Sequence, residues 1–311
     1  MSPRRTAFFD VGTNTILCLI AEIRDTGRFR VLDDLAEITR LGQGVDRTGV
    51  ISPEGERRSL EVLKRYRDHC KNLGVDEIIA VGTSALRDAK NSSDVRMRFH
   101  DELGIDIRVI SGDEEAAYSF VAAQRGLSLF GKELLVIDVG GGSTELIRGN
   151  ENGVCQAISI DLGSVRLTER YLHGDPVRRE EVLHMTEAIG RELSSLTEHG
   201  MRASARVTLV GIAATFTTLA AIEKKLAQYS HSQVHGSILT LDEIRRQIRL
   251  LQEQTVAERK RIIGLEPKRA DVIFAGACLI ERIMTFWHAD RVIVSDQGVR
   301  YGLLHEAARL L

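Results

Sequence analysis

Three consecutive apolar segments open the chain, and their residue types are those of strands. They are TAFFDV, TILCLIAEI and RFRVLDDLAEITRL, residues 6–11, 15–23 and 28–41. All three are rich in β-branched and aromatic residues, and turn-forming residues separate them. We therefore predict a meander of three strands at the N-terminus.

A helix is predicted after the meander, in SPEGERRSLEVLKRYRDHCKNLG, residues 52–74. Ser52 is the expected N-cap and Pro53 the first helical residue, apolar residues recur with a period of 3.6, and Gly74 ends the pattern. Two further segments, residues 76–91 and 105–127, each change from a strand-like to a helix-like pattern. These segments predict βα units.

The same succession of patterns occurs a second time, starting at ELLVIDVGGGSTELIRG, residues 133–149. It continues with a strand-like segment at 153–163, helical patterns near 164–172 and 177–197, the strand RVTLVGI at 206–212, further helices, and a final strand and helix over 291–311. Both halves thus start with a meander and continue with βα units, which predicts an α/β fold.

The two halves also resemble each other residue by residue. AFFDVGTNTILCLI and LVIDVGGGSTELIR superpose with Asp10 on Asp138 and Gly12 on Gly140, an offset of 128 residues. This similarity suggests an internal duplication, and we expect the equivalent turns to face each other across a cleft.

The chemistry of the two turns indicates phosphate binding. Glycines after a strand let backbone amides approach an oxyanion closely, and an aspartate before the turn can hold Mg²⁺. Hydroxyl groups supply more donors, at Thr13, Thr15, Ser143 and Thr144. The alternative is that each Asp-x-Gly is only a hairpin turn, but a hairpin needs neither three glycines nor the same aspartate twice.

Composition restricts the partners and the compartment. With 311 residues, 43% hydrophobic and 28% charged, the chain is long enough for two domains, and its net charge of −2 provides no global basic field for nucleic acid or membranes. The four cysteines form no CxxC pair. We therefore expect no disulfide framework and no zinc site, no signal peptide or membrane span, and a cytoplasmic location.

Six motifs together resemble one family. They are FFDVGTNT, GTSALRDAKN, ISGDEEA, VIDVGGGSTELI, LGSVRLTERY and PKRADVIFAGA. In this order and spacing they are similar to the exopolyphosphatase and guanosine pentaphosphate phosphatase family, across essentially the whole chain. The resemblance implies two actin-like, ribonuclease H-like domains, expected at 1–124 plus 299–311 and at 125–298, with the active site in the cleft between them. It also implies Mg²⁺-dependent removal of the terminal phosphate from polyphosphate or guanosine pentaphosphate.

The resemblance also implies roles for individual residues. Glu115 matches the family's catalytic base, Arg87 an arginine that clamps a phosphoryl group, and Glu145 an acid that positions the water or the metal. Glu114 with Ser111 fits a capping box instead. Phosphate is expected at Gly12, Thr13, Asn14, Gly140, Gly141, Gly142, Ser143 and Thr144. Metal is expected at Asp10, Asp138 and Glu145.

Several features leave alternatives open. In GIAATFTTLAA, Ala214 stands where proteins of the wider actin-like superfamily are expected to have glycine, which makes a nucleotide-base site doubtful. The basic segment 245–264 is either a solvated helix face or a track for a polyanion. The apolar stripe of PKRADVIFAGACLIERI is expected to be core rather than site, with Arg269 facing the cleft as the alternative. A small-molecule kinase or a nucleotide-dependent switch are the alternative functions.

The chain ends at Leu311, as expected for a short, two-domain member of the family. The sequence leaves the oligomeric state open, a homodimer being one alternative.

Overall fold

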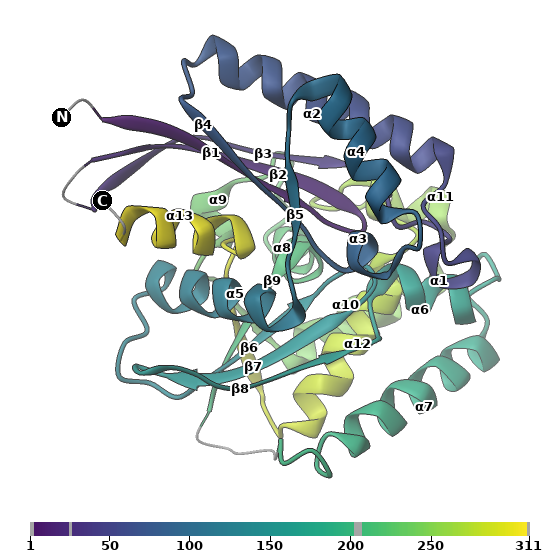
Figure 1. Cartoon of the computed structure of the whole chain (residues 1–311). Coiled ribbons are helices and arrows are strands. Elements are labelled where there is room, and N and C mark those ends of the chain that lie inside the picture. The colour runs from purple at the N-terminus through teal and green to yellow at the C-terminus, as the bar shows by residue number, and fades with distance from the viewer. Residues whose placement is uncertain (1–2, 25–26, 202–206, 310–311) are drawn as a thin grey trace. The chain divides into compact units, whose positions relative to one another are not determined.

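The computed structural model describes residues 3–24, 27–201 and 207–309 (Figure 1). The chain divides into two compact units. Unit 1 comprises Met1–Ala122 with Gly298–Leu311, and unit 2 comprises Ala123–Gln297. The chain therefore crosses from one unit to the other twice, once within a helix and once shortly before the last helix.

Unit 1 is built on a five-stranded sheet with the order β3-β2-β1-β4-β5. The predicted meander is confirmed, since β1 pairs antiparallel with β2 and β2 with β3, while β4 and β5 are added in parallel. The strands are β1 (Arg4–Val11), β2 (Thr15–Ile23), β3 (Phe29–Ile38), β4 (Glu77–Gly82) and β5 (Ile107–Val109).

The helices of unit 1 begin with the one that the sequence marks most clearly. Helix α2 spans Pro53–Asn72, and the side chain of Ser52 accepts a hydrogen bond from the amide of Gly55 at 3.1 Å, as expected of an N-cap. The other helices are α1 (Val45–Thr48), α3 (Ser84–Asp88), α4 (Ser92–Leu103), α5 (Gly112–Gly126, which runs on into unit 2) and α13 (Val299–Arg309).

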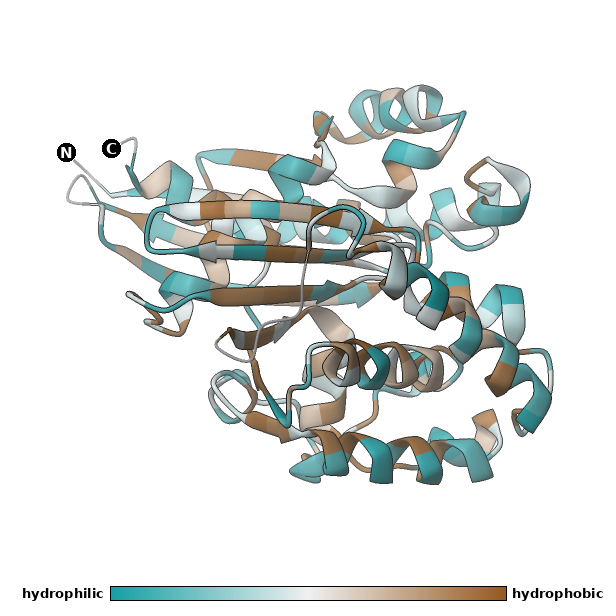
Figure 2. Cartoon of the chain, turned by 90° about the horizontal axis from the view of Figure 1, so that it is seen from below, coloured by the Kyte–Doolittle hydropathy of each residue, from teal (hydrophilic) through white to brown (hydrophobic). Residues whose placement is uncertain are grey.

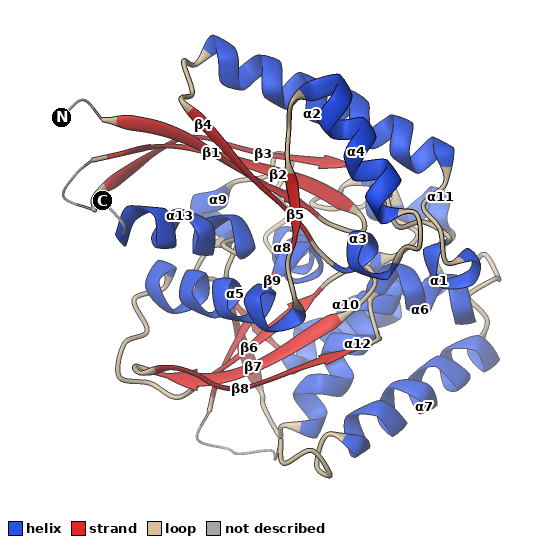
Figure 3. Ribbon diagram, in the orientation of Figure 1, coloured by secondary structure: helices blue, strands red, loops and turns tan. Residues whose placement is uncertain are grey.

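Two hydrophobic clusters cover the faces of this sheet. Phe9 and Cys18 belong to the cluster with α2, whereas Phe8 and Leu19 belong to the cluster with α13. This division follows from the pleat of a strand, which points successive side chains to opposite faces. The near-continuous apolar runs of β1 and β2 therefore reflect burial on both faces. Figure 3 shows α2 and α13 on opposite sides of this sheet.

Unit 2 repeats this architecture in a six-stranded sheet with the order β10-β11-β9-β6-β7-β8. Read from the other edge, β8-β7-β6-β9-β11 has the pairing directions of the unit 1 sheet, and β10 adds one antiparallel edge strand. The strands are β6 (Leu134–Val139), β7 (Thr144–Asn150), β8 (Gly153–Ile160), β9 (Thr208–Ile212), β10 (Ile238–Thr240) and β11 (Arg291–Val294).

The internal duplication extends to the register of the strands. Asp10 lies opposite Leu17 in the β1–β2 pair, and Asp138 lies opposite Glu145 in the β6–β7 pair, seven residues along in both cases. The turn between the strands is closed in the same way in each unit, by Gly12 N donating to Thr15 O at 3.1 Å and by Gly140 N donating to Ser143 O at 3.0 Å.

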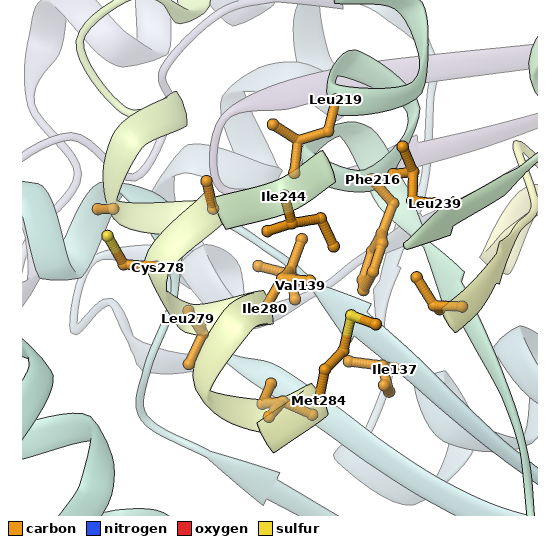
Figure 4. Close-up of a cluster of buried hydrophobic side chains, with 14 of the residues drawn as sticks. Ile137, Val139, Phe216, Leu219, Leu239, Ile244, Cys278, Leu279, Ile280 and Met284 are labelled. Carbon is orange, nitrogen blue, oxygen red and sulfur yellow. The ribbon is translucent and has the colours of Figure 1, made fainter. Parts of the chain in front are cut away.

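The core of unit 2 lies between its sheet and a layer of helices. Helix α12 is buried along most of its length, so the apolar stripe of PKRADVIFAGACLIERI is core, as the sequence indicated (Figure 4). The strands carry long apolar runs, whereas the outer helices alternate apolar and polar positions (Figure 2). The helices are α6 (Ser164–Tyr171), α7 (Arg179–Ser195), α8 (Ala213–Glu223), α9 (His231–Val234), α10 (Leu241–Glu253), α11 (Val256–Arg259), α12 (Ile273–Phe286) and the 3₁₀ turn η1 (Pro267–Arg269).

The observed elements differ from the predicted ones in two places. The strand predicted to reach residue 41 ends at Ile38, because the amides of Thr39 and Arg40 donate to the carbonyl of Asn14 instead of continuing the ladder. Strand β10 was not predicted. Residue 206 and residues 310 and 311, at the edges of two predicted elements, lie outside the described residues. Within the described ranges, no helix has both the length and the apolar character needed to cross a membrane.

Candidate phosphate-binding and catalytic site

The first glycine turn, residues 12–14 of unit 1, has two carbonyl groups that accept hydrogen bonds from the segment 39–42. The carbonyl of Thr13 accepts from Gly42 N at 2.9 Å, and that of Asn14 accepts from the amides of Thr39 and Arg40, both at 3.0 Å. In the part of the chain that the structure describes, the amides of Thr13 and Asn14 donate no hydrogen bond themselves. The turn therefore offers donors rather than acceptors, as an anion site requires.

Asn14 adds a side-chain donor to this turn. Its side chain is buried at 8% exposure, and its Nδ2 has no hydrogen-bond partner within the described residues. A buried polar group without a partner is costly, so such groups in native proteins call for an explanation. An oxyanion bound in the turn would supply the missing acceptor.

The second glycine turn, in unit 2, is held by the start of α6. The carbonyl of Gly140 accepts from Ser164 N at 3.0 Å, and that of Gly141 accepts from Val165 N at 2.9 Å. A Cβ at Gly163 would lie 2.3 Å from the carbonyl oxygen of Gly141, so only glycine allows this close approach. Gly163 lies in the motif LGSVRLTERY, although no role was expected for the glycine itself.

Donors again remain available at this turn. Across the described ranges, the amides of Gly141, Gly142 and Ser143 donate no hydrogen bond. The hydroxyl of Thr144 is different, because it donates to the carbonyl of Leu162 at 2.6 Å and is fully buried. Its one proton is thus not available to a phosphate oxygen, and we assign the Thr144 hydroxyl to holding the end of β8.

Two of the predicted acidic residues of unit 2 lie side by side. Asp138 and Glu145 are directly opposite each other on β6 and β7, and they are 8% and 2% exposed. Ile137 and Val139, the neighbours of Asp138, both point into the hydrophobic core. Asp138 and Glu145 therefore share the opposite face of the sheet, beside the second turn. Glu145 Oε1 accepts from the hydroxyl of Ser159 at 2.8 Å.

Asp10 is the equivalent acidic residue of unit 1. Burial raises the pKa of its carboxyl group to about 6, and the positive charge of Arg300 partly offsets this effect. Arg300 is itself buried and forms two hydrogen bonds to Asp34, at 2.8 and 3.0 Å. Arg300 is a site neighbour that the sequence analysis missed, since 290 residues separate it from Asp10 and no local pattern connects them.

At the start of α5, two neighbouring glutamates have different surroundings. Glu114 and Ser111 form the predicted capping box, with Glu114 N donating to Ser111 Oγ at 3.2 Å and Ser111 N donating to Glu114 Oε2 at 2.9 Å. The hydrogen bond from Ser111 N, with the charge of Arg108, lowers the pKa of Glu114. Glu115 is instead buried at 7% exposure, and its Oε2 accepts from Arg87 Nη1 at 3.0 Å. The structure therefore brings Arg87 and Glu115 together.

Two features of the sequence are candidates for a metal site. The predicted ligands Asp138 and Glu145 are adjacent in unit 2, and Asp10 belongs to unit 1. The second is HSQVH, residues 231–235, an HxxxH spacing that runs against the expectation of no zinc site. Both of these histidines contact Asp296, at 2.6 and 3.0 Å. Among the described residues, no group of three or more His, Cys, Asp or Glu side chains could hold a metal ion.

Two further segments of unit 2, GIAATFTTLAA and residues 245–264, can be compared with the expectations from the sequence. The left-handed backbone conformation in this segment, with φ of 66°, occurs at Ala213 and not at Ala214. In the basic segment, Arg245 and Arg246 pair with Glu281 and Glu223, and Arg259 is buried at 1% exposure. Arg249, Lys260 and Arg261 of the same segment are exposed, so the solvated helix face and the polyanion track both stay open as predictions.

Comparisons with known proteins identify the family that this chain resembles. The model of the Ppx/GppA phosphatase family matches residues 19–310. Exopolyphosphatase 2 of Mycobacterium tuberculosis is 35% identical, over 97% of this chain and 98% of its own length. A bifunctional 3-dehydroquinate synthase/phosphatase of Fusobacterium nucleatum is 32% identical over 96% of this chain, which spans only 46% of that relative.

A solved structure agrees with the fold. The crystal structure of the Ppx/GppA family member of Aquifex aeolicus has a TM-score of 0.82 and 34% identity, and the similarity covers 99% of this chain and 98% of that one. With the two equivalent sheets, this similarity confirms the predicted α/β fold of two actin-like units and the predicted resemblance.

Proposed function

We propose that this chain, which belongs to the Ppx/GppA phosphatase family, is an exopolyphosphatase that hydrolyses the terminal phosphoanhydride bond of inorganic polyphosphate. The name of the M. tuberculosis relative, which is similar over nearly its full length, supports this substrate. The observation that carries the proposal is the repeated turn. In each unit the turn has its carbonyl groups tied back, its central amides available and a buried aspartate directly before it.

In this proposal the turns bind phosphoryl oxygens. Unit 1 contributes the amides of Thr13 and Asn14 and the unpartnered Nδ2 of Asn14, and unit 2 contributes the amides of residues 141–143. Amide donors fixed by the backbone suit a transferring phosphoryl group, because they need no reorganisation as charge develops on its oxygens. Ser143, which is buried beside these amides, adds its hydroxyl.

We further propose Mg²⁺ as the cofactor, with Asp138, Glu145 and Asp10 as its candidate carboxylates. Mg²⁺ usually keeps several waters and is bound by one or two carboxylates together with substrate phosphates, so the proposal needs no cluster of three direct ligands. Asp138 and Glu145 suit a hard cation, since both are buried carboxylates on neighbouring strands of one sheet face. Asp10 suits it as well, because burial disfavours its charged form and a nearby cation would restore it. The metal would neutralise charge on the phosphoryl oxygens.

Glu115 is the proposed general base. Its carboxylate takes a proton from the attacking water, the water oxygen bonds to the terminal phosphorus, and the bridging P–O bond breaks to release orthophosphate and a chain shorter by one unit. The ion pair with Arg87 fixes the Glu115 carboxylate at the start of α5. The same arginine carries the positive charge proposed to stabilise the phosphoryl group.

Guanosine pentaphosphate is the second proposed substrate, since it ends in the same phosphoanhydride. We propose it as the link of this chain to the stringent response. One assay separates the substrates: phosphate release from short polyphosphate, long polyphosphate, guanosine pentaphosphate and ATP, with and without Mg²⁺. Release from polyphosphate but not from ATP is expected. An enzyme that releases phosphate only from ATP would contradict the proposal.

A further inference from the structure

Three polar or acidic side chains form one row across the sheet of unit 2. Asp138 on β6 lies opposite Glu145 on β7, and Glu145 lies opposite Ser159 on β8. Ser159 stands between Ile158 and Ile160, which both pack into the hydrophobic core. By the alternation of a strand, Ser159 shares the face of Asp138 and Glu145.

Unit 1 supplies an internal comparison for this row. At the equivalent positions Asp10 lies opposite Leu17, and Leu17 lies opposite Ala36. The sheet of unit 1 thus forms with two apolar residues where unit 2 has Glu145 and Ser159. A strand pair with this register needs neither an acid nor a hydroxyl at these positions, so folding alone does not account for the polar residues of unit 2.

The contact between the two residues is direct. Ser159 Oγ donates to Glu145 Oε1 at 2.8 Å. Glu145 is 2% exposed, whereas Ser159 lies on the edge strand with an exposed side chain. A buried carboxylate depends on its donors, and a donor at one oxygen also fixes the rotation of the carboxylate plane.

From this contact we infer that Ser159 is a positioning residue, which orients the Glu145 carboxylate for the proposed phosphohydrolase reaction. The inference rests on the proposed function, in which Glu145 acts at the metal and phosphate. Ser159 itself touches neither substrate nor metal in this account. Its effect passes through Glu145, and this dependence can be measured.

The first test compares three single variants by steady-state kinetics on polyphosphate with saturating Mg²⁺. Ser159→Ala should lower kcat about tenfold, the lower end of the range for a hydrogen bond to a charged group, because water can partly replace an exposed hydroxyl. KM should stay within about twofold. Ser159→Thr keeps the hydroxyl and should recover most of the activity. Ser195→Ala, which removes a hydroxyl that donates to the carbonyl of Glu192, is the matched control and should behave as wild type.

The second test is a double-mutant cycle with Glu145→Gln. If Ser159 acts through Glu145, adding Ser159→Ala to Glu145→Gln should lower kcat no further. Independent, multiplying losses would overturn the inference, as would a Ser159→Ala enzyme with wild-type kcat or a Ser159→Thr enzyme as impaired as Ser159→Ala. A wild-type protein that releases no phosphate from any polyphosphate would overturn the proposed function itself, and this inference with it.

Discussion

Glu114 and Glu115 are adjacent on α5 and have different surroundings. Glu114 caps the helix and pairs with Arg108, whereas Glu115 is buried and pairs with Arg87. The difference arises because successive helical residues point about 100° apart, so only one of the two faces the interior of unit 1. A single helix start can therefore provide a structural carboxylate and a proposed catalytic one.

This difference predicts unequal effects of one conservative change. Glu115→Gln keeps size and hydrogen bonding but removes the base, so kcat should fall by about 10² to 10⁴ with little change in melting temperature. Glu114→Gln retains a capping box and should leave kcat within several-fold of wild type. Phosphate release at saturating polyphosphate measures both. Equal kcat values in the two variants would show that Glu115 is not the base.

The backbone conformation of Ala213 predicts how a change at this single residue affects stability. A non-glycine residue with φ of 66° is strained, and Ala213→Gly should relieve the strain and raise the free energy of unfolding by roughly 0.5 to 1 kcal/mol. Ala214→Gly, one residue further into α8, should instead lower it, because glycine weakens a helix. Urea unfolding of both variants checks this, and a loss of stability in Ala213→Gly would refute the strain.

At the scale of elements, His235 connects two segments near the crossings between the units. Its Nε2 lies 3.1 Å from the carbonyl of Gly126, at the end of α5, and its Nδ1 lies 3.0 Å from the carboxylate of Asp296, after β11. Both nitrogens can donate only in the imidazolium form. The hydrogen bond with Asp296 is the main cause that raises the pKa of His235, and burial opposes it.

A pH dependence of stability follows. Because the folded-state pKa of His235 is raised above 6.5, its stabilisation is fully present below about pH 6.5 and is lost as the pH rises through the folded-state pKa. The difference in unfolding free energy between wild type and His235→Gln should therefore be largest near pH 5.5 and shrink toward pH 8.5. His184→Gln, at an exposed histidine, is the control. A difference that does not change with pH would exclude the imidazolium.

Local sequence patterns predicted some element boundaries correctly and missed others. Helix α2 was predicted from its cap, its period and its final glycine, all of which are local signals. The end of β3 at Ile38 could not be predicted, since it depends on the carbonyl of Asn14, which is distant in sequence. Strand β10 was missed because three residues are too few for a periodic pattern, and its pairing partner β11 follows some fifty residues later.

At the scale of the whole chain, the duplication made the candidate site predictable. Comparing the two halves singled out both turns and their aspartates, and the register and closing hydrogen bonds repeat in the structure. The ion pair of Arg87 with Glu115 and the charge of Arg300 near Asp10 could not be predicted, because they join segments that no repeat or spacing relates.

The metal proposal depends on both copies of the repeat and predicts strict dependence on a divalent cation. Excess chelator should abolish phosphate release, and added Mg²⁺ should restore it. Asp138→Ala should lower kcat at least about a hundredfold while circular dichroism and melting temperature stay near wild type. Asp290→Ala, an exposed aspartate of the same unit, serves as control. Full activity in chelator would refute the metal.

The central claim is that water attacks the terminal phosphorus of polyphosphate, and hydrolysis in ¹⁸O-labelled water tests it most directly. If the account is correct, mass spectrometry should find one ¹⁸O atom in each released orthophosphate and none in the remaining chain. Label at the end of the remaining chain would mean attack at the inner phosphorus. Phosphoryl groups found only on another acceptor would mean transfer rather than hydrolysis, and either result would contradict the account.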